Sequence, residues 1–190
     1  MSFLPKDYKI PSTSNYYKFE EGDNTFRILG SFEDGTAIMG TEYWVTKDGK
    51  RFPKRLPVGQ PVLVEEIEIN PQTGEDEVPK HFWAMPVWNF ETKSVQILEI
   101  TQKTIMTVIR SLAKNPKWGD PNQYNLVVTR TKVNDKTNYM VTPEPKEELD
   151  KEVYKILNQM NIKIEKLFSG LDPFGNDKAE DLADKADKAI

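Results

Sequence analysis

The sequence predicts a mainly β fold: an OB-like, partly open barrel of five to six strands, with one inserted helix and a C-terminal amphipathic helix. Short runs rich in β-branched and aromatic residues recur along the chain, separated by turn signals built on Gly, Asn and Asp. Between the later strands, one stretch has apolar residues at helical spacing, and a longer amphipathic stretch follows the last strand. The same pattern also fits another small β-barrel or a sandwich.

This pattern divides the chain into an arm, a core, a helix and a tail. Residues 1–24 combine prolines with a polar cluster and show no sustained period, which predicts an N-terminal arm. Residues 25–143 contain the strands of the core, and residues 171–190 are expected to form a mobile acidic tail. Residues 144–170 form the amphipathic helix, which should pack on the barrel or on a partner. Its apolar face carries Leu149, Val153, Ile156, Met160, Ile164 and Leu167.

The core is expected to open with the runs TFRILGSF and GTAIMGTEYWVT. The sequence KDGK, from Lys47 to Lys50, is a hairpin signal because Gly tolerates the positive φ of a tight turn. VLVEEIEI is predicted to be a further strand, followed by an acidic loop and the aromatic strand HFWAMPVWNF. After VQILEI, Thr101 is expected to cap a helix that ends at Asn115-Pro116. The runs YNLVVTRTKV and NYMVTP then form the last hairpin.

Length and composition exclude several classes of protein. With 190 residues and 37% hydrophobic content, the chain suits one globular domain with appendages. No membrane-spanning apolar run and no secretory leader are visible, which predicts a soluble intracellular protein. Cysteine is absent, which excludes disulfides, thiolate nucleophiles and sulfur-based zinc sites. A Ser/His/Asp triad would need the sole histidine, His81, for which we expect a structural role.

The net charge of −4 is unevenly distributed. Residues 1–143 have 18 basic and 18 acidic side chains, so the whole excess lies in the C-terminal part. Within this neutral body, the run from Lys47 to Arg55 has five cations against Asp48, a local charge of +4. The run predicts an anion-binding groove, and the tail, with net charge −3, is expected to compete for it. A merely solubilising loop is the alternative for the basic run.

The strand from His81 to Phe90 is unusually aromatic for a soluble protein. In a regular strand, Phe82 and Trp88 share one face and Trp83 lies on the other, so both faces are apolar. One interpretation is a strand of the barrel wall, with its outer face covered by the C-terminal helix or the arm. The other is a platform on which unpaired bases stack, each contact contributing about 1–3 kcal/mol. Pro86 lacks an N–H, which predicts an edge position or a bulge.

Aromatic and basic residues are interleaved along the chain, as single-strand binding requires. The candidate stacking residues are Tyr43, Trp44, Phe52, Trp83, Trp88 and Trp118. The candidate phosphate-binding residues are Arg27, Lys47, Lys50, Arg51, Lys54, Arg55, Lys80, Lys117, Arg130 and Lys132. Charges on strands also fit an ordinary solvated strand face. The candidate partner-binding residues of the tail are Asp172, Phe174, Asp177, Glu180, Asp181, Asp184 and Asp187.

Two other function classes stay open. The first is a protein-interaction or assembly module, in which the amphipathic helix makes the contacts, self-association included, and the aromatic strand is only core. The second is a metal-dependent nuclease, whose Mg²⁺ would need the carboxylates before the aromatic strand. Half of those carboxylates lie in a loop without fixed register, so neither a catalytic residue nor a metal or cofactor is predicted. They are Glu65, Glu66, Glu68, Glu75, Asp76 and Glu77.

The order of segments in residues 25–143 resembles that of the single-stranded DNA-binding, or helix-destabilising, proteins of bacteriophages. The segments are TFRILGSF, KHFWAMPVWNF, VQILEITQKTI, NPKWGDP and YNLVVTRT. The resemblance implies an OB-fold core that coats single-stranded DNA during replication, recombination and repair in the cytoplasm of the infected host. It also implies an acidic C-terminal tail that contacts other replication proteins.

By position, the resemblance points to the basic hairpin from Lys47 to Arg55 and to the aromatic residues Tyr43, Trp44, Trp83 and Trp88. The T-even phage relative is a zinc protein, whereas this chain has no cysteine, so no zinc site is carried over. The tail sequence LDPFGND looks like the partner-binding tip of bacterial single-stranded DNA-binding proteins. In those proteins the Pro-Phe pair is terminal, whereas here sixteen residues follow Phe174.

Overall fold

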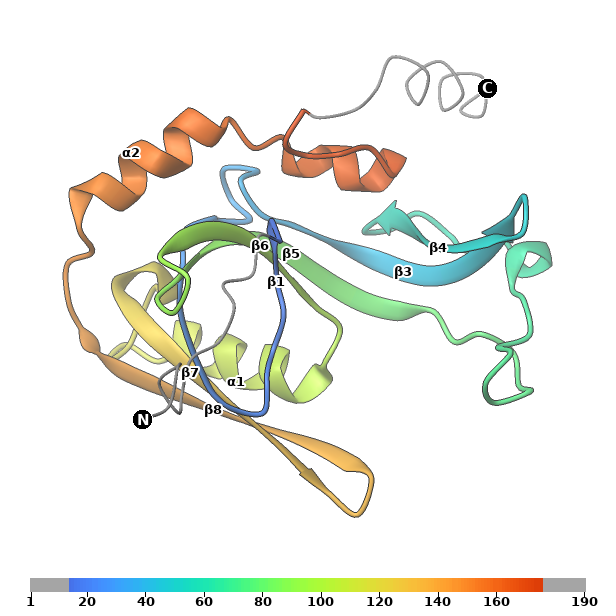
Figure 1. Ribbon diagram of the computed structural model, residues 1–190, viewed down its shortest axis with the longest axis horizontal. Helices are drawn as coiled ribbons and strands as arrows, with labels where there is room; N and C mark the ends of the chain where they lie inside the picture. The colour runs from blue at the N-terminus through green and yellow to red at the C-terminus, as the bar shows by residue number, and fades with distance from the viewer. Residues whose placement is uncertain (1–13, 176–190) are drawn as a thin grey trace, which may run out of the picture.

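The computed structural model describes residues 14–175 (Figure 1). Five predicted tail residues, Asp177, Glu180, Asp181, Asp184 and Asp187, therefore lie outside the described residues. The strands are β1 (Tyr16–Tyr17), β2 (Gly22–Ile28), β3 (Ile38–Lys47), β4 (Lys50–Pro57), β5 (Lys80–Asn89), β6 (Ser94–Ile100), β7 (Tyr124–Val133) and β8 (Lys136–Lys146). The α-helices are α1 (Lys103–Lys114) and α2 (Lys151–Met160), and the 3₁₀ helices are η1 (Val64–Glu66), η2 (Pro121–Gln123) and η3 (Ile164–Ser169).

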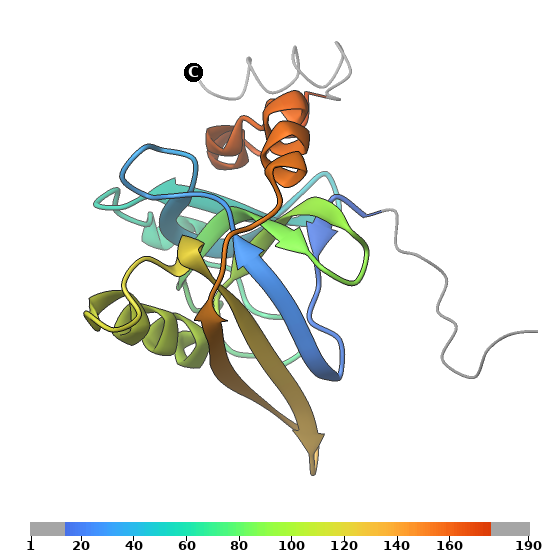
Figure 2. The same ribbon diagram turned by 90° about the vertical axis from the view of Figure 1, so that its left-hand side faces the viewer.

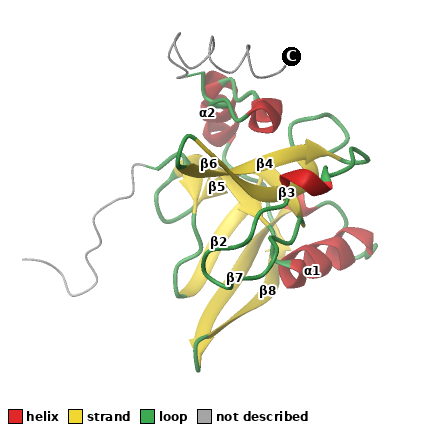
Figure 3. Ribbon diagram, turned by 90° about the vertical axis from the view of Figure 1, so that its right-hand side faces the viewer, coloured by secondary structure: helices red, strands yellow, loops and turns green. Residues whose placement is uncertain are grey.

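The predicted mainly β class is confirmed. All eight strands of residues 14–175 join one sheet that does not close, in the order β1-β6-β5-β2-β7-β8, with β3 on β5 and β4 on β3. β1 pairs in parallel with β6, whereas the other pairs are antiparallel, so the sheet is mixed. α1 lies on one side of the sheet, and α2 and η3 lie on the other (Figure 3). This arrangement is consistent with an OB-like fold.

The aromatic strand β5 is central, and the expectation of an edge or a bulge at Pro86 is wrong. β6 pairs with β5 along one edge, while β2 and β3 pair with different ends of the opposite edge. Pro86 lies between these two partners, where its carbonyl accepts the N–H of Leu29 at 3.0 Å. The N–H and C=O of one strand residue point to the same neighbouring strand. The N–H that Pro86 lacks would therefore point to the side of Leu29, toward the turn after β2. A central strand tolerates proline there because no ladder bond is lost.

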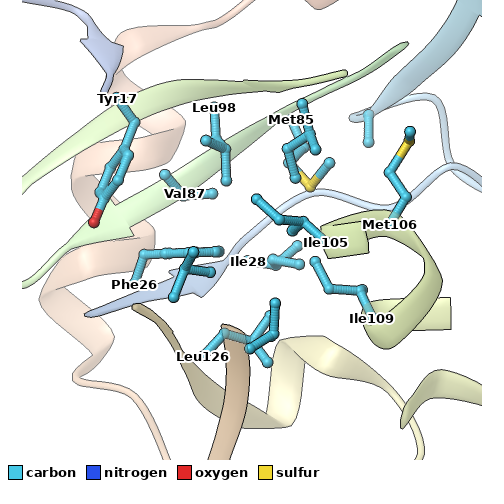
Figure 4. Packing of buried hydrophobic residues seen from close by; sticks show 14 of the residues in the cluster. Tyr17, Phe26, Ile28, Met85, Val87, Leu98, Ile105, Met106, Ile109 and Leu126 are labelled. Atoms are coloured by element: carbon cyan, nitrogen blue, oxygen red, sulfur yellow. The ribbon is translucent and has the colours of Figure 1, made fainter. Parts of the chain in front are cut away.

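Both faces of β5 are buried, as the barrel-wall interpretation requires. Met85 and Val87 join a core with Phe26 and with Ile105 and Ile109 of α1 (Figure 4). On the opposite face, Phe82 and Ala84 pack with Ile97 and with two residues of η3, Ile164 and Leu167. The predicted cover of the outer face by the C-terminal segment is therefore confirmed. Of the aromatic residues in this run, Phe82 is buried and not available for stacking, whereas Trp83, Trp88 and Phe90 are partly exposed.

The segment between β4 and β5 is not the predicted strand VLVEEIEI. It contains η1 and a single isolated bridge between Ile69 and Asp76. Leu63 and Val64 are exposed, so their apolar character marks no strand face. The prediction failed because the glutamates of this segment bind the neighbouring hairpin through their side chains. At α1, Gln102 and not Thr101 occupies the position before the helix, and it makes no side-chain cap.

The C-terminal region is not one continuous helix. α2 ends at Met160, and Asn161 adopts a left-handed conformation with φ 46°, which turns the chain toward the sheet. The following η3 then delivers Ile164 and Leu167 to the outer face of β5. The first residues of the predicted tail pack as well, since Phe174 lies edge-on to Tyr16 with ring centroids 6.2 Å apart. The carboxylate of Asp172 accepts the Phe174 N–H at 3.0 Å, and both residues stay partly exposed, so their partner-binding role stays a prediction.

The predicted arm also contributes to the sheet. β1 and the first residues of β2 lie before residue 25, where the core was expected to begin. At the other end of the sheet, β7 and β8 form a long hairpin that extends beyond the remaining strands (Figure 2). None of the helices within residues 14–175 has the length and apolar character needed to cross a membrane.

Candidate nucleic-acid interface

The basic hairpin forms as predicted but is largely neutralised. β3 and β4 pair up to Lys47 and Lys50, and the turn between them has positive φ at Asp48 (52°) and Gly49 (72°). Arg51 forms an ion pair with Glu77, a carboxylate that is only 6% exposed. Its guanidinium also lies over the ring of Trp44, 5.3 Å from the centroid. Arg51 is therefore already engaged by an anion and an aromatic ring of its own chain.

Three glutamates from the segment after β4 bind this hairpin, and we call Glu66, Glu68 and Glu77 the acidic clasp. Glu66 accepts hydrogen bonds from Lys54 Nζ at 2.6 and 2.7 Å, which is the main cause of the lowered pKa of its carboxyl. Glu68 accepts the backbone N–H and the hydroxyl of Thr46 at 2.7 and 2.8 Å. The segment 64–77 has six carboxylates against the +4 of the hairpin, so together they carry −2. The hairpin is not the positive surface that its sequence predicts.

Arg55 is not a phosphate contact. Its side chain is buried, and its guanidinium pairs with Glu42 and with Glu99, each at 2.8 Å, above the ring of Phe82. Burial raises the pKa of Glu99, and Arg55 opposes that rise. Arg55 thus holds two carboxylates against the outer face of β5, and its role is structural.

Arg27 and Tyr43 were also predicted to contact DNA, and both are only 1% exposed. Arg27 Nε donates to Asn125 Oδ1 at 2.8 Å, and Nη1 donates to the carbonyls of Asn122 and Glu147. It ties β2 to β7 and to the ends of η2 and β8, and burial lowers its pKa. The Tyr43 hydroxyl donates to Glu66, and burial raises its pKa. Neither side chain can reach a ligand without unfolding its surroundings.

Trp44 and Phe52 are exposed, at 38% and 40%, but they do not share a face. Phe52 lies opposite Val45 and Trp44 lies opposite Pro53 in the β3–β4 ladder. Directly paired residues point to the same side of an antiparallel sheet, and neighbours along a strand point to opposite sides. The two rings therefore belong to opposite faces of the hairpin and cannot form one stacking platform.

Between the start of β5 and α1 lies an open groove of about 430 Å³, which we call the α1 groove. Three cations line it, Lys80, Lys103 and Arg110, and no carboxylate of the described chain does. All three are exposed and make no ion pair within residues 14–175. The full lining is Lys80, His81, Trp83, Thr101, Lys103, Met106, Thr107 and Arg110. Positive charge is concentrated here, whereas the clasp offsets it on the hairpin.

An aromatic pair stands beside these cations. Trp83 is half-buried against the core and donates its indole N–H to Nε2 of His81 at 3.1 Å. Phe32, from the loop between β2 and β3, meets the Trp83 ring edge-on with centroids 5.4 Å apart. Phe32 is 38% exposed. The groove thus combines cations with an apolar ring surface, the two features that single-stranded nucleic acid binding uses.

The remaining predicted residues are scattered. Trp88 lies opposite Arg27, on the side of the sheet away from the α1 groove, and Trp118 packs edge-on to Tyr124. Arg130 donates to the carbonyl of Phe19, and Lys132 pairs with the exposed Asp135 at 3.4 Å. The others are exposed and do not line the groove; they are Lys47, Lys50 and Lys117. Of the predicted set, Lys80 and Trp83 are brought together.

Sequence analysis missed Lys103, Arg110 and Phe32. The sequence does contain a signal for Lys103 and Arg110. Together with Thr107 and Lys114 they recur at the helical spacing i, i+4, i+7 and i+11. This spacing gives a polar and mainly basic stripe on one face of α1. Phe32 has no comparable signal, since a single loop aromatic shows no period.

Comparison with known proteins adds no assignment. No family model matches the chain, and no curated protein matches it. The resemblance to phage single-stranded DNA-binding proteins therefore stays a prediction. For the nuclease alternative, residues 14–175 contain no group of three or more His, Asp or Glu side chains placed to hold a metal ion. Three of the carboxylates considered for it form the acidic clasp.

Proposed function

We propose that the protein binds single-stranded DNA without sequence preference and without catalysis, in phage replication, recombination or repair in the host cytoplasm. The observation that supports this function is the α1 groove, where three cations that make no ion pair within residues 14–175 adjoin the Trp83–Phe32 pair. Phosphates bind the cations, while an unpaired base stacks on the rings. A duplex offers phosphates but hides the faces of its bases, so the groove favours single strands.

Salt dependence follows from the same geometry. Each phosphate neutralised on a single strand contributes about −0.7 to the slope of log K against log salt concentration. Lys80, Lys103 and Arg110 together therefore account for a slope of roughly −2. Steeper measured slopes would assign further cations, such as Lys47 and Lys50 at the hairpin tip, to the interface.

A second function has its own support. Exposed apolar side chains concentrate on the segment between β4 and β5, namely Val58, Leu63, Val64, Ile69 and Val78. Apolar exposure of this kind marks protein-interaction surfaces. A protein-interaction module is thus the alternative, with this segment and not the predicted amphipathic helix as its contact surface.

Tryptophan fluorescence tests the proposal directly. Oligo(dT) is expected to quench the emission, less so as salt rises, and a duplex of equal length is expected to quench it much less. Trp83→Phe should remove most of the quenching, because Trp83 lines the groove. The control Trp118→Phe should retain it, because Trp118 packs on Tyr124 and does not line the groove. Absence of quenching and of a complex at low salt would favour the interaction module instead.

Weakening the acidic clasp is expected to strengthen binding. Glu77→Gln removes the carboxylate that pairs with Arg51, so one more cation becomes available to phosphate. We expect tighter binding of oligo(dT) and a salt slope steeper by about 0.7, measured by fluorescence titration. Glu75→Gln is the matched control, since it removes the same charge from an exposed side chain of the same loop. Equal gains in both variants would mean that net charge alone, and not the freed Arg51, is responsible.

A further inference from the structure

His81 forms a side-chain hydrogen bond with Trp83 at the edge of the α1 groove. It is the only histidine of the chain, and its Nε2 accepts the indole N–H of Trp83 at 3.1 Å. An indole nitrogen donates and never accepts, so Nε2 must be unprotonated for this bond to form. The imidazole in this arrangement is neutral, with its proton on Nδ1.

Cations and uncharged residues line the groove around His81. Lys103 and Arg110 face the groove from α1, and Lys80 lines it from the same strand as His81. Across the ladder, β3 places the uncharged Thr41 opposite His81. The next residue of β3, Glu42, lies opposite Lys80, and its carboxylate pairs with Arg55. No carboxylate in the described part of the chain lines the groove to stabilise an imidazolium.

We propose that His81 is a proton-linked phosphate contact, neutral in the free protein and protonated in the complex. This inference rests on the proposed function, because a polyanion in the groove supplies negative charge that none of the described lining residues provides. The ring takes its proton from solvent at Nε2, and the hydrogen bond from Trp83 breaks. The new Nε2–H then donates to a phosphate oxygen, and the Trp83 indole is free to turn its face toward a base.

Protonation of His81 on binding makes the affinity for DNA depend on pH. The complex binds one more proton than the free protein and free DNA together, so affinity rises as pH falls. Histidine ordinarily titrates between about pH 5 and 8, whereas solvent-exposed carboxylates ordinarily titrate below that range and lysines above it. Between pH 7.5 and 5.5, affinity for oligo(dT) should therefore increase, by about tenfold per pH unit at most.

Because His81 is the sole histidine, its imidazole gives one unambiguous NMR signal in the full-length chain. At a fixed pH between 5.5 and 7.5, adding oligo(dT) should move this signal toward that of a protonated imidazole. Calorimetry at pH 7 in two buffers of different ionisation enthalpy should show net proton uptake on binding. An unchanged imidazole signal in the complex, or binding without proton uptake, would overturn the proposal.

Two variants separate this proposal from the function on which it rests. His81→Gln keeps a polar side chain without a titratable charge, so it should bind oligo(dT) with an affinity that does not vary between pH 5.5 and 7.5. His81→Lys carries a permanent charge and should bind tightly at both values. Binding by the wild type that is equal at both values contradicts the His81 proposal alone. If the wild type binds oligo(dT) at neither pH, both the proposed function and this inference are wrong.

Discussion

Replacing Lys103 and Arg110 together by alanine is expected to weaken oligo(dT) binding roughly 10- to 100-fold at low salt and to reduce the salt slope by about 1.4. Both side chains line the α1 groove, and neither makes an ion pair within the described residues. Their removal therefore leaves no carboxylate of residues 14–175 without its ion-pair partner. Alanine also favours the helix, so α1 should keep its structure and its core contacts through Ile105 and Ile109.

The control for this pair removes the same charge from elsewhere. Lys151→Ala/Lys163→Ala deletes two exposed cations at the starts of α2 and η3, which lie on the other side of the sheet from α1. Fluorescence titration should show near wild-type binding for this control, and thermal melts should be close to wild type for both double variants. Equal losses of affinity would show that net charge, and not the groove, governs binding.

Fold class and local turns could be predicted because their signals are local. The hairpin turn at Asp48-Gly49 needs positive φ at neighbouring residues, which the sequence itself indicates, and the apolar period of α1 spans adjacent turns. The prediction of one long C-terminal helix was wrong because it also used a local signal alone. Its apolar period continues past Met160, whereas the chain turns at Asn161 so that Ile164 can reach β5. A tertiary contact decided that boundary.

The candidate site was harder to predict because a sequence shows charges without their partners. Arg51 pairs with a carboxylate 26 residues away, and Arg55 with one 44 residues away. Such pairing requires the folded sheet, so a basic run in the sequence becomes a neutral hairpin in the structure. Lys80 and Trp83 are close in sequence to each other, but the cations that complete their groove come from α1, which is brought there only by core packing.

Arg55→Met is expected to lower the free energy of unfolding by about 3 kcal/mol, because it leaves Glu42 and Glu99 without their shared cation at the sheet surface. Methionine keeps much of the apolar stem over Phe82, so lost packing contributes little. Urea denaturation measures the loss. Arg110→Met, at an exposed arginine without an ion pair in the described chain, should change stability by less than about 0.5 kcal/mol.

The deficit of Arg55→Met should shrink as pH falls from 8 to 5. Burial already raises the pKa of Glu99, and Arg55 is the group that opposes this rise. Without Arg55 the folded variant holds a proton on this carboxyl more tightly than the unfolded chain does, so protonation stabilises the fold. Combining Arg55→Met with Glu99→Gln should recover part of the lost stability at pH 8, because one of the two orphaned charges is gone. If Arg55→Met instead lowered DNA affinity without lowering stability, Arg55 would belong to the nucleic-acid interface as the sequence predicted.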